Sequence, residues 1–311
     1  MAKIAIVGCG AMGSVYAALM VSAGHQVHAI SLWADHVLAM QTNGLRVEGA
    51  SGDRTVPIQA GTTTNGIGHC DLVIIATKAF DVEAAARAAL PLLGKRTVVQ
   101  TIQNGLGSAD KVAAIVGEDR VAMGVVGGFG ASMRAPGHAH HNGMEMIRFG
   151  PYKGLPPSDL EEAAEIWRSA GFRVALFQDT KQMVWEKLIM NVAFSGTTCS
   201  TGLTIGEVMN DPNAWWVAKS CAEEAIAVAQ AAGIHMDIGD PIEHVRNLGS
   251  KIPDARPSML LDFNLRRRGE VDAINGSIVL EGEKYGVPTP INRAVVAIIK
   301  ARESAFSPES A

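Results

Sequence analysis

Short apolar runs alternate with longer amphipathic segments in the first half of the chain. The apolar runs are residues 3–7, 26–31, 71–76 and 97–101, and Ala-rich stretches with helical spacing lie at about 11–23 and 81–92. Continuous apolar strands between amphipathic helices are typical of a parallel sheet that helices cover on both faces. The first half therefore predicts a doubly wound, Rossmann-type α/β sheet.

The second half has the spacing of helices almost throughout. After a last strand at 172–177, apolar positions recur with helical period, and Pro and Gly residues separate the segments. The expected helices are 180–195, 213–232, 258–267, 272–285 and 291–303. We expect two domains, a Rossmann dinucleotide-binding domain at 1–178 and an all-helical substrate and dimerisation domain at 179–311.

Composition narrows the class of protein. The 311 residues are 48% hydrophobic and 19% charged, as in a folded globular protein, and the net charge of −4 gives no reason to expect a nucleic-acid partner. No apolar stretch is long enough to span a membrane, and the N-terminus lacks a signal-peptide pattern. The four scattered cysteines contain no C-x-x-C pair, so we expect no metal centre, no disulfides and a cytoplasmic location.

A glycine-rich motif directly follows the first strand and opens the first helix. It reads Gly8-Cys9-Gly10-Ala11-Met12-Gly13. The first glycine permits the tight turn, the second lets a pyrophosphate approach the backbone, and the third lets helix and strand pack closely. The free N–H groups of the helix N-terminus complete a phosphate site, so the motif predicts a bound dinucleotide.

The end of the second strand does not identify which dinucleotide binds. An acidic residue here is typical of NAD sites and a nearby basic residue of NADP sites, but Ser31 occupies the expected position. Ser31 can bond either a hydroxyl or a phosphate. Asp35 is expected to cap the following helix, and His36 to lie on the surface or to assist a phosphate.

Two polar loops follow further strands of the predicted sheet. Lys78 comes after the strand at 71–76, and Asn104 comes after the strand at 97–101. Ligands of open α/β sheets bind outside the carboxyl ends of the strands. Both side chains are therefore expected near the cofactor and the substrate, although Lys78 alone is equally well explained as a solvated lysine.

A polar stripe marks the first helix of the second half. Lys187, Asn191 and Ser195 are spaced four apart and share one face of an otherwise apolar helix. A lysine among apolar residues is costly to bury without a function, and the alternative is that it extends to solvent.

Further polar residues lie near the C-terminal end of the chain. They include Asp262, Glu270 and Asp272, together with the basic run Arg266-Arg267-Arg268, which we expect to be a solvated helix face. Ser258 follows Pro257 at the start of a predicted helix, where an N-cap is the structural alternative to a binding role.

These motifs together resemble the ketopantoate reductase (2-dehydropantoate 2-reductase) family over nearly the whole chain. Besides the glycine loop, the resemblance lies in Thr77-Lys78-Ala79-Phe80, Gln103-Asn104-Gly105-Leu106-Gly107, Glu186-Lys187-Leu188 with Asn191, Pro257-Ser258-Met259-Leu260 and Gly269-Glu270-Val271-Asp272-Ala273-Ile274-Asn275-Gly276. It implies NADPH-dependent reduction of 2-dehydropantoate to pantoate, in a cleft between a Rossmann domain and a helical domain.

The resemblance also implies roles for individual residues. Lys187 is the implied general acid, and Glu270 orients the lysine and the substrate and contributes to cofactor binding. Asn104 and Asn191 bracket substrate and nicotinamide, and Ser258 binds the substrate carboxylate. Lys78 lies by the cofactor ribose and the cleft, and Ser195 lies in the substrate pocket. The implied partner is a small 2-keto acid, and the helical domain is a candidate surface for a homodimer.

The chain departs from the family pattern at three places. Ser195 stands where the family typically has a second Asn, Leu261 where it often has Gln, and Leu32 or Trp33 where it tends to have the Arg of the NADP phosphate site. An NAD-dependent dehydrogenase of another 2-hydroxyacid, such as D-mandelate, is therefore a second hypothesis. A sensor that binds NAD(P) without turnover is a third, against which the general-acid lysine argues.

Overall fold

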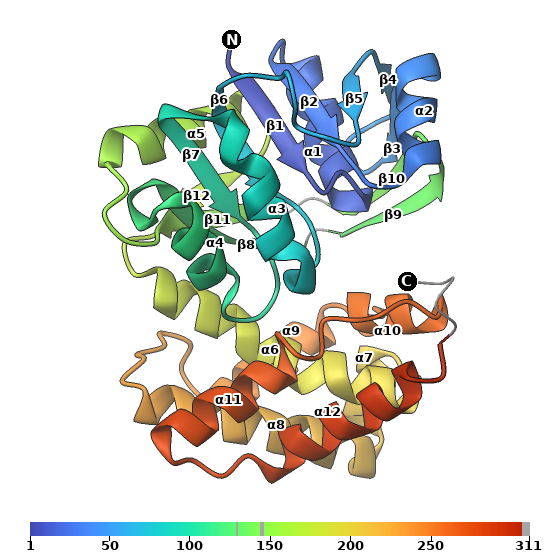
Figure 1. Ribbon diagram of the computed structural model, residues 1–311. Coiled ribbons are helices and arrows are strands. Elements are labelled where there is room, and N and C mark those ends of the chain that lie inside the picture. Colours follow the sequence, from blue (N-terminus) through green and yellow to red (C-terminus); the bar gives the residue numbers. More distant parts are fainter. Residues whose placement is uncertain (129, 144–145, 307–311) are drawn as a thin grey trace. The chain divides into compact units, whose positions relative to one another are not determined.

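The chain folds into two compact units. The structure is a computed structural model that describes residues 1–128, 130–143 and 146–306 (Figure 1). The first unit comprises Met1–Gln103 and Ser108–Thr180, and the second comprises Asn104–Gly107 and Lys181–Ala311. The second unit thus takes its residues from two separate stretches of sequence.

An eight-stranded sheet forms the centre of the first unit. Its strands lie in the order β12 (Val174–Leu176), β11 (Met146–Pro151), β8 (Val121–Gly127), β7 (Leu93–Thr101), β6 (Cys70–Ile75), β1 (Lys3–Val7), β2 (Gln26–Ile30) and β5 (Gln59–Gly61). All neighbouring pairs are parallel except β11 with β8. From β1 the chain adds β2 on one side and β6 on the other, which creates the switch point where such sheets bind ligands.

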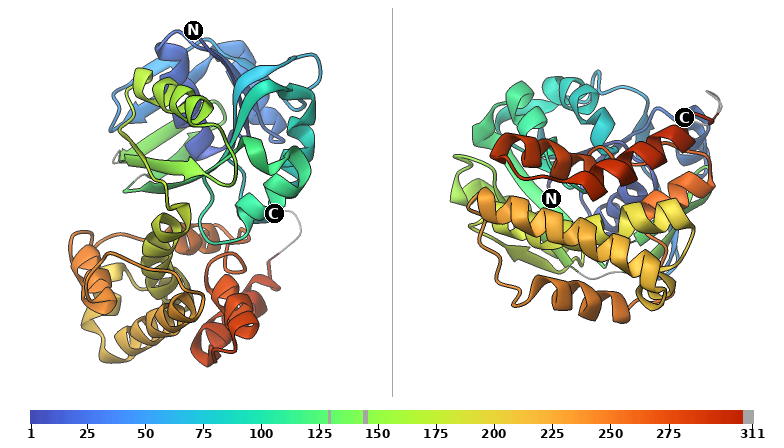
Figure 2. Two further views of the ribbon diagram at one scale, coloured as in Figure 1. Left: turned by 90° about the vertical axis from the view of Figure 1, so that its left-hand side faces the viewer. Right: turned by 90° about the horizontal axis from the view of Figure 1, so that it is seen from below.

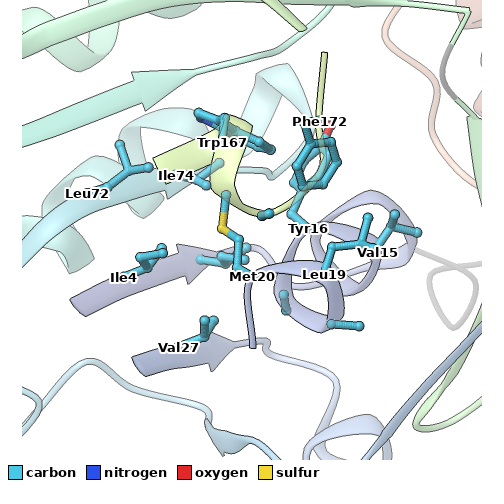
Figure 3. Close-up of a cluster of buried hydrophobic side chains, with 14 of the residues drawn as sticks. Ile4, Val15, Tyr16, Leu19, Met20, Val27, Leu72, Ile74, Trp167 and Phe172 are labelled. Atoms are coloured by element: carbon cyan, nitrogen blue, oxygen red, sulfur yellow. The ribbon is translucent and has the colours of Figure 1, made fainter. Parts of the chain in front are cut away.

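Alternate residues of the central strands enter two different cores. Ile4 and Ile6 of β1 pack with α1 (Ala11–Ser22) and α5 (Pro157–Ser169), whereas Ala5 and Val7 face α3 (Val82–Ala89) and α4 (Ser108–Val116). Figure 3 shows the first core around the rings of Tyr16, Trp167 and Phe172. Helices thus cover both faces, and the predicted doubly wound fold is confirmed.

A second, four-stranded sheet in the first unit was not predicted. Its order is β4 (Arg54–Val56), β3 (Leu45–Gly49), β10 (His138–Gly143) and β9 (Gly130–Ala135). The segments of β9 and β10 read GASMRA and HAHHNG, which contain no β-branched residue. They form strands because they pair with their neighbours, although their own propensity is weak. The helix α2 (Ala34–Asn43) lies between β2 and β3 in the chain.

The second unit is helical in the part that the structure describes, as predicted. Its helices are α6 (Thr180–Thr201), which begins at the last residue of the first unit, α7 (Ile205–Asn210), α8 (Pro212–Ala231), α9 (Pro241–Ser250), α10 (Ser258–Asn264), α11 (Asn275–Tyr285) and α12 (Pro290–Glu303). Small residues of α8, among them Ala218, Ala222 and Ala225, are fully buried and let α11 and α12 pack against it (Figure 2).

Two local expectations for the second unit were wrong or incomplete. Helix α10 ends at Asn264 rather than near 267, and Arg266 adopts a left-handed conformation with φ +55°, so the arginine run does not lie on a helix face. The short helices α7 and α9 were not among the predicted segments. Over the described ranges, no helix has the length and apolarity needed to cross a bilayer.

Candidate active site

The glycine turn between β1 and α1 is built as its sequence predicts. Gly8 has φ +93°, and a Cβ atom there would lie 2.5 Å from Cγ2 of Thr77. A Cβ at Gly13 would lie 3.0 Å from the Gly8 carbonyl oxygen. The amides of Gly8 and Cys9 both donate to the carbonyl of Ile30, at 2.9 and 2.7 Å. Close contacts within the protein therefore require glycine at positions 8 and 13.

Gly10 differs from these two glycines, because a Cβ atom there would meet no atom of the described residues within 4 Å. The first amide to bond back into α1 is that of Ser14, which donates to the Gly10 carbonyl at 2.8 Å. The N–H groups that precede it in the first turn point out of the helix, as at any helix N-terminus. Beside the turn, the buried hydroxyl of Thr77 has no partner within the described chain. This arrangement suits an anionic ligand.

A buried histidine supports the turn. His36 is fully buried, so the expectation that it lies on the surface was wrong. Its Nδ1 accepts the Gly137 amide at 2.8 Å, and its Nε2 lies 3.2 Å from the Ser14 hydroxyl, which is 3.8 Å from the Cys9 thiol. Burial lowers the pKa of His36, and a hydrogen bond with the Cys9 backbone partly opposes this. The imidazole is therefore neutral at pH 7 and links the second sheet to the glycine loop.

The thiol of Cys9 is a structural member of this loop. Burial raises the pKa of the Cys9 thiol to about 12, with a smaller opposing effect from Ser14. A thiol with this pKa is protonated at neutral pH and is a poor nucleophile. Cys9 therefore contributes packing and its backbone to the loop.

The segment after β2 carries no positive charge. Ser31 is buried, its amide donates to the Gly61 carbonyl at 3.1 Å, and its hydroxyl accepts the Trp33 amide at 3.3 Å. Leu32 is 90% exposed, and Trp33 stacks on the ring of His36 at 5.3 Å. Residues 26–43 and 59–66, which surround this strand end, contain neither Lys nor Arg.

Asp35 does not cap α2 as expected. The N-cap position is Trp33, and Asp35 lies inside the first turn. A carboxylate there still interacts favourably with the positive end of the helix dipole. It also adds a negative charge to the end of β2.

The ends of β6 and β7 lie at the same edge of the sheet as the glycine turn. Lys78 follows β6, and its carbonyl accepts the Asp81 amide at 3.0 Å to begin the 3-10 helix η1 (Ala79–Asp81). Gln103 follows β7 and donates to the carbonyls of Ile75, at 2.7 Å, and Thr77, at 3.1 Å. The sequence predicted no role for Gln103, because hydrogen bonds from a side-chain amide to the backbone leave no periodic pattern in a sequence.

A lysine and two asparagines meet in the second unit. Lys187 Nζ donates to Oδ1 of Asn104 at 2.8 Å, and the Asn191 amide approaches the same oxygen at 3.5 Å. Lys187 and Asn191 lie one turn apart on α6, whereas Asn104 is 83 residues earlier in the sequence. The lysine thus donates to a neutral oxygen, not to a carboxylate, in this contact. An ammonium group held in this way can also donate to a carbonyl oxygen of a ligand.

Asn104 is held in place by the loop that contains it. The Leu106 amide donates to the Ala273 carbonyl at 3.0 Å, and a Cβ atom at Gly105 would lie 2.0 Å from the same oxygen. Gly105 also has φ +87°. Only glycine fits here, for both steric and conformational reasons. The loop therefore packs against the segment that carries Glu270.

Three other predicted site residues, Ser195, Ser258 and Glu270, also belong to the second unit. Ser195 is buried one turn beyond Asn191, and Glu270 is only 6% exposed. Ser258 is exposed and is the first residue of α10, with Pro257 at the N-cap position, so the capping role considered for Ser258 was wrong. A Cβ atom at Gly269 would lie 2.9 Å from Met259 Cγ. The segments that carry Ser258 and Glu270 are therefore in contact.

Known proteins match this chain along nearly its whole length. Residues 4–154 match the family described as ketopantoate reductase PanE/ApbA, and residues 179–303 match its C-terminal model. A 2-dehydropantoate 2-reductase from Archaeoglobus fulgidus is 30% identical over 97% of this chain and 98% of its own.

Solved structures have the same fold. A PanE/ApbA family ketopantoate reductase from Ralstonia eutropha JMP134 is 31% identical, with a TM-score of 0.89 over 97% of this chain and 98% of that one. D-mandelate dehydrogenase, solved with NADH and anilino(oxo)acetate, has a TM-score of 0.91 over 98% of this chain and 99% of its own. Its identity is 24%, so this likeness concerns the fold alone.

The buried imidazole predicts a component of acid sensitivity. Because the pKa of His36 is lowered in the folded state, the unfolded chain binds the proton more readily. Its contribution to stability is complete above the unfolded pKa of about 6.5 and is lost as the pH falls below it. We expect His36→Asn to lose less stability than the wild type between about pH 7.5 and about pH 5.

Thermal unfolding of both proteins across this pH range measures the effect. The exposed His235 provides a control variant, His235→Asn, which should follow the wild type. Equal pH dependence in His36→Asn and the wild type would contradict the assignment.

Proposed function

The chain belongs to the ketopantoate reductase PanE/ApbA family, and on that premise we propose that it reduces 2-dehydropantoate to (R)-pantoate with a nicotinamide cofactor. It is an oxidoreductase of the class that acts on CH–OH groups. The observation that carries the proposal is the hydrogen bond from Lys187 Nζ to Asn104 Oδ1, at 2.8 Å. It fixes the position of an ammonium group that can serve as a proton donor.

The glycine turn is the proposed dinucleotide site. The open space at Gly10, the first-turn amides of Ala11, Met12 and Gly13, and the orphan hydroxyl of Thr77 fit a pyrophosphate. The backbone of Gly8 and Cys9 shapes the turn, and Lys78 and Ser31 extend the site along the same sheet edge. When bound, the cofactor supplies the hydride for the keto carbon.

The polar group on α6 is the proposed site for the keto acid. Lys187 would donate a hydrogen bond to the keto oxygen, polarise the carbonyl and pass its proton to the developing alkoxide. Asn104 orients the ammonium by accepting one of its N–H groups, and the Asn191 carboxamide supplies a further donor beside it.

Other residues of the second unit complete the proposal. Ser258, at the exposed start of α10, would bind the substrate carboxylate, and Ser195 would line the substrate pocket. The buried Glu270 would orient the substrate and Lys187 and contribute to cofactor binding.

Removing the ammonium group tests the acid role. We expect Lys187→Ala to lower kcat for 2-dehydropantoate by about 100- to 10,000-fold, the usual contribution of a general acid. The dissociation constant of the reduced dinucleotide should change little, because the phosphate site lies in the glycine turn. Lys219→Ala, which removes an exposed lysine of α8 paired with Glu223, is the matched control. Full activity of Lys187→Ala would refute the mechanism.

Alanine substitutions at Gly8 and Gly10 should affect different properties, the first the stability of the fold and the second the binding of the dinucleotide. At Gly10 a methyl group meets no atom of the residues that the structure describes and φ is −94°, so Gly10→Ala should unfold at the wild-type temperature. It should nevertheless weaken dinucleotide binding about tenfold or more, because the methyl group occupies the space proposed for the pyrophosphate. Gly8→Ala should lower the unfolding temperature, since it clashes with Thr77. Unchanged binding by Gly10→Ala, measured by titration of nucleotide fluorescence, would argue against the site.

The choice between NADPH and NADH is a separate question. The family resemblance implies NADPH, but the end of β2 favours NADH. A 2′-phosphate there would meet the apolar side chain of Leu32 and the negative charge of Asp35. Residues 26–43 and 59–66 provide no Lys or Arg to bond it, and His36 is neutral. A doubly charged phosphate without a cation loses the charge-assisted hydrogen bonds that normally select it.

Initial rates of 2-dehydropantoate reduction with NADH and NADPH at equal concentration test both the substrate and the cofactor. We expect kcat/KM to be at least about tenfold higher with NADH, as the loss of one charged hydrogen bond would cause. Leu32→Arg should shift the preference toward NADPH. A preference for NADPH in the wild type would show that Ser31 and its neighbours hold the phosphate without a cation. Inactivity with both cofactors would refute the proposal that 2-dehydropantoate is the substrate.

A second candidate function is the reduction of a different 2-oxoacid by the same chemistry. Ser195 is a short, buried side chain at the position where the family typically has Asn, which alters the volume and the donors available to a substrate. A panel of 2-oxoacids with bulkier or aromatic substituents tests this candidate by comparison of kcat/KM. Cofactor binding without turnover on the whole panel would instead favour a sensor.

A further inference from the structure

The last turn of α12 contacts three segments that lead to the proposed active site. Lys300, Arg302 and Glu303 lie within four positions of one another at the end of this helix. Their partners are Asp272, the carbonyls at the end of α6, and the amide of Gly269.

We propose that Glu303 is a positioning residue for Glu270, acting through the backbone of Gly269. Glu303 Oε1 accepts the Gly269 amide at 2.7 Å, one residue before Glu270. On the other side, Lys300 Nζ donates to Asp272 at 2.8 Å. The last turn of α12 thus holds the chain immediately before and shortly after Glu270.

The backbone of Glu270 is fixed by further contacts. Its carbonyl accepts the amides of Ala273 and Ile274, both at 3.0 Å, which closes a tight turn. Ala273 in turn accepts the Leu106 amide from the loop of Asn104. A shift at Gly269 would therefore move Glu270 and disturb the loop that orients Lys187.

Gly269 has little room to move while this bond is present. It is buried, and a Cβ atom there would lie 2.9 Å from Met259 Cγ and 3.4 Å from Glu303 Oε1. The preceding residues are held as well, since Arg266 adopts its left-handed conformation while its guanidinium donates to the Ala305 carbonyl at 2.7 Å. Removing the Glu303 carboxylate would leave a buried amide unpaired, which favours displacement of the loop.

Arg302 connects the same turn to the helix of the proposed acid. Its Nη1 donates to the carbonyls of Cys199 and Ser200, both at 3.1 Å, near the C-terminal end of α6. These are carbonyls that a helix leaves without internal partners. The adjacent residues Arg302 and Glu303 therefore tie the helix of Lys187 and the loop of Glu270 to one rigid turn.

The test compares Glu303→Ala with Glu303→Gln, which keeps an acceptor oxygen. The inference rests on the proposed function, so kinetics with 2-dehydropantoate are the first measurement. We expect Glu303→Ala to lower kcat/KM by about 10- to 100-fold through misplacement of Glu270, and Glu303→Gln to retain most of the wild-type value. Glu283→Ala, which removes an exposed carboxylate of α11 paired with Arg293 of α12, should behave as the wild type.

A second measurement reports on the contact itself. Hydrogen exchange at the Gly269 amide should be faster in Glu303→Ala and slow in Glu303→Gln and the wild type. Assays at low temperature, with thermal unfolding as a check, separate misplacement from simple loss of folded protein. A merely structural role would lower the unfolding temperature and leave the kinetic constants of folded protein unchanged.

The possible failures are distinguishable. Unchanged kcat/KM in Glu303→Ala, or equal impairment of both Glu303 variants, would refute the positioning role while leaving the function intact. Wild-type protein that reduces no 2-oxoacid would refute the proposed function and this inference with it.

Discussion

The carbonyl oxygen of Ala273 occupies the place that a side chain at residue 105 would need, and the candidate substrate site depends on this close approach. Gly105 lets the loop of Asn104 lie against the segment of Glu270, and the Leu106 amide secures it at 3.0 Å. Only then can the Asn104 oxygen reach Lys187 on α6. A larger residue at position 105 would separate the lysine from its orienting amide, whatever the stability of either unit.

Hydrophobic periodicity predicted five of the eight strands of the main sheet, β1, β2, β6, β7 and β12, and most of the helices, but it missed β5, β8 and β11. The buried strands β1 and β6 are almost wholly apolar runs, so they can be identified as strands from their own residues. The second sheet could not be found in this way, because β10 contains three histidines and becomes a strand only by pairing with β3 and β9. Helix α10 ends earlier than predicted, just before the left-handed Arg266, whose guanidinium donates to the Ala305 carbonyl 39 residues away.

The residues of the candidate site were named from motifs, and their roles remain predictions. Spacing alone places Lys187 and Asn191 on one face, and the structure adds their common partner Asn104. The supporting residues were not accessible from sequence. His36 seemed a surface residue because its partners, Ser14 and Gly137, lie far from it in the chain. Gln103 bonds only backbone groups, the carbonyls of Ile75 and Thr77 and the amide of Ile102, so no side-chain pattern identifies its role.

The discontinuous second unit has a consequence for the evolution of this chain. Asn104–Gly107 lie in the middle of the sequence of the first unit, yet they pack with Lys181–Ala311. A single crossover between two related genes near residue 180 would combine a loop from one parent with an α6 and an Ala273 segment from the other. Such a hybrid would inherit mismatched partners at the lysine. An exchange that keeps the partners of Lys187 together therefore has to include Asn104–Gly107 as well as the stretch after residue 180.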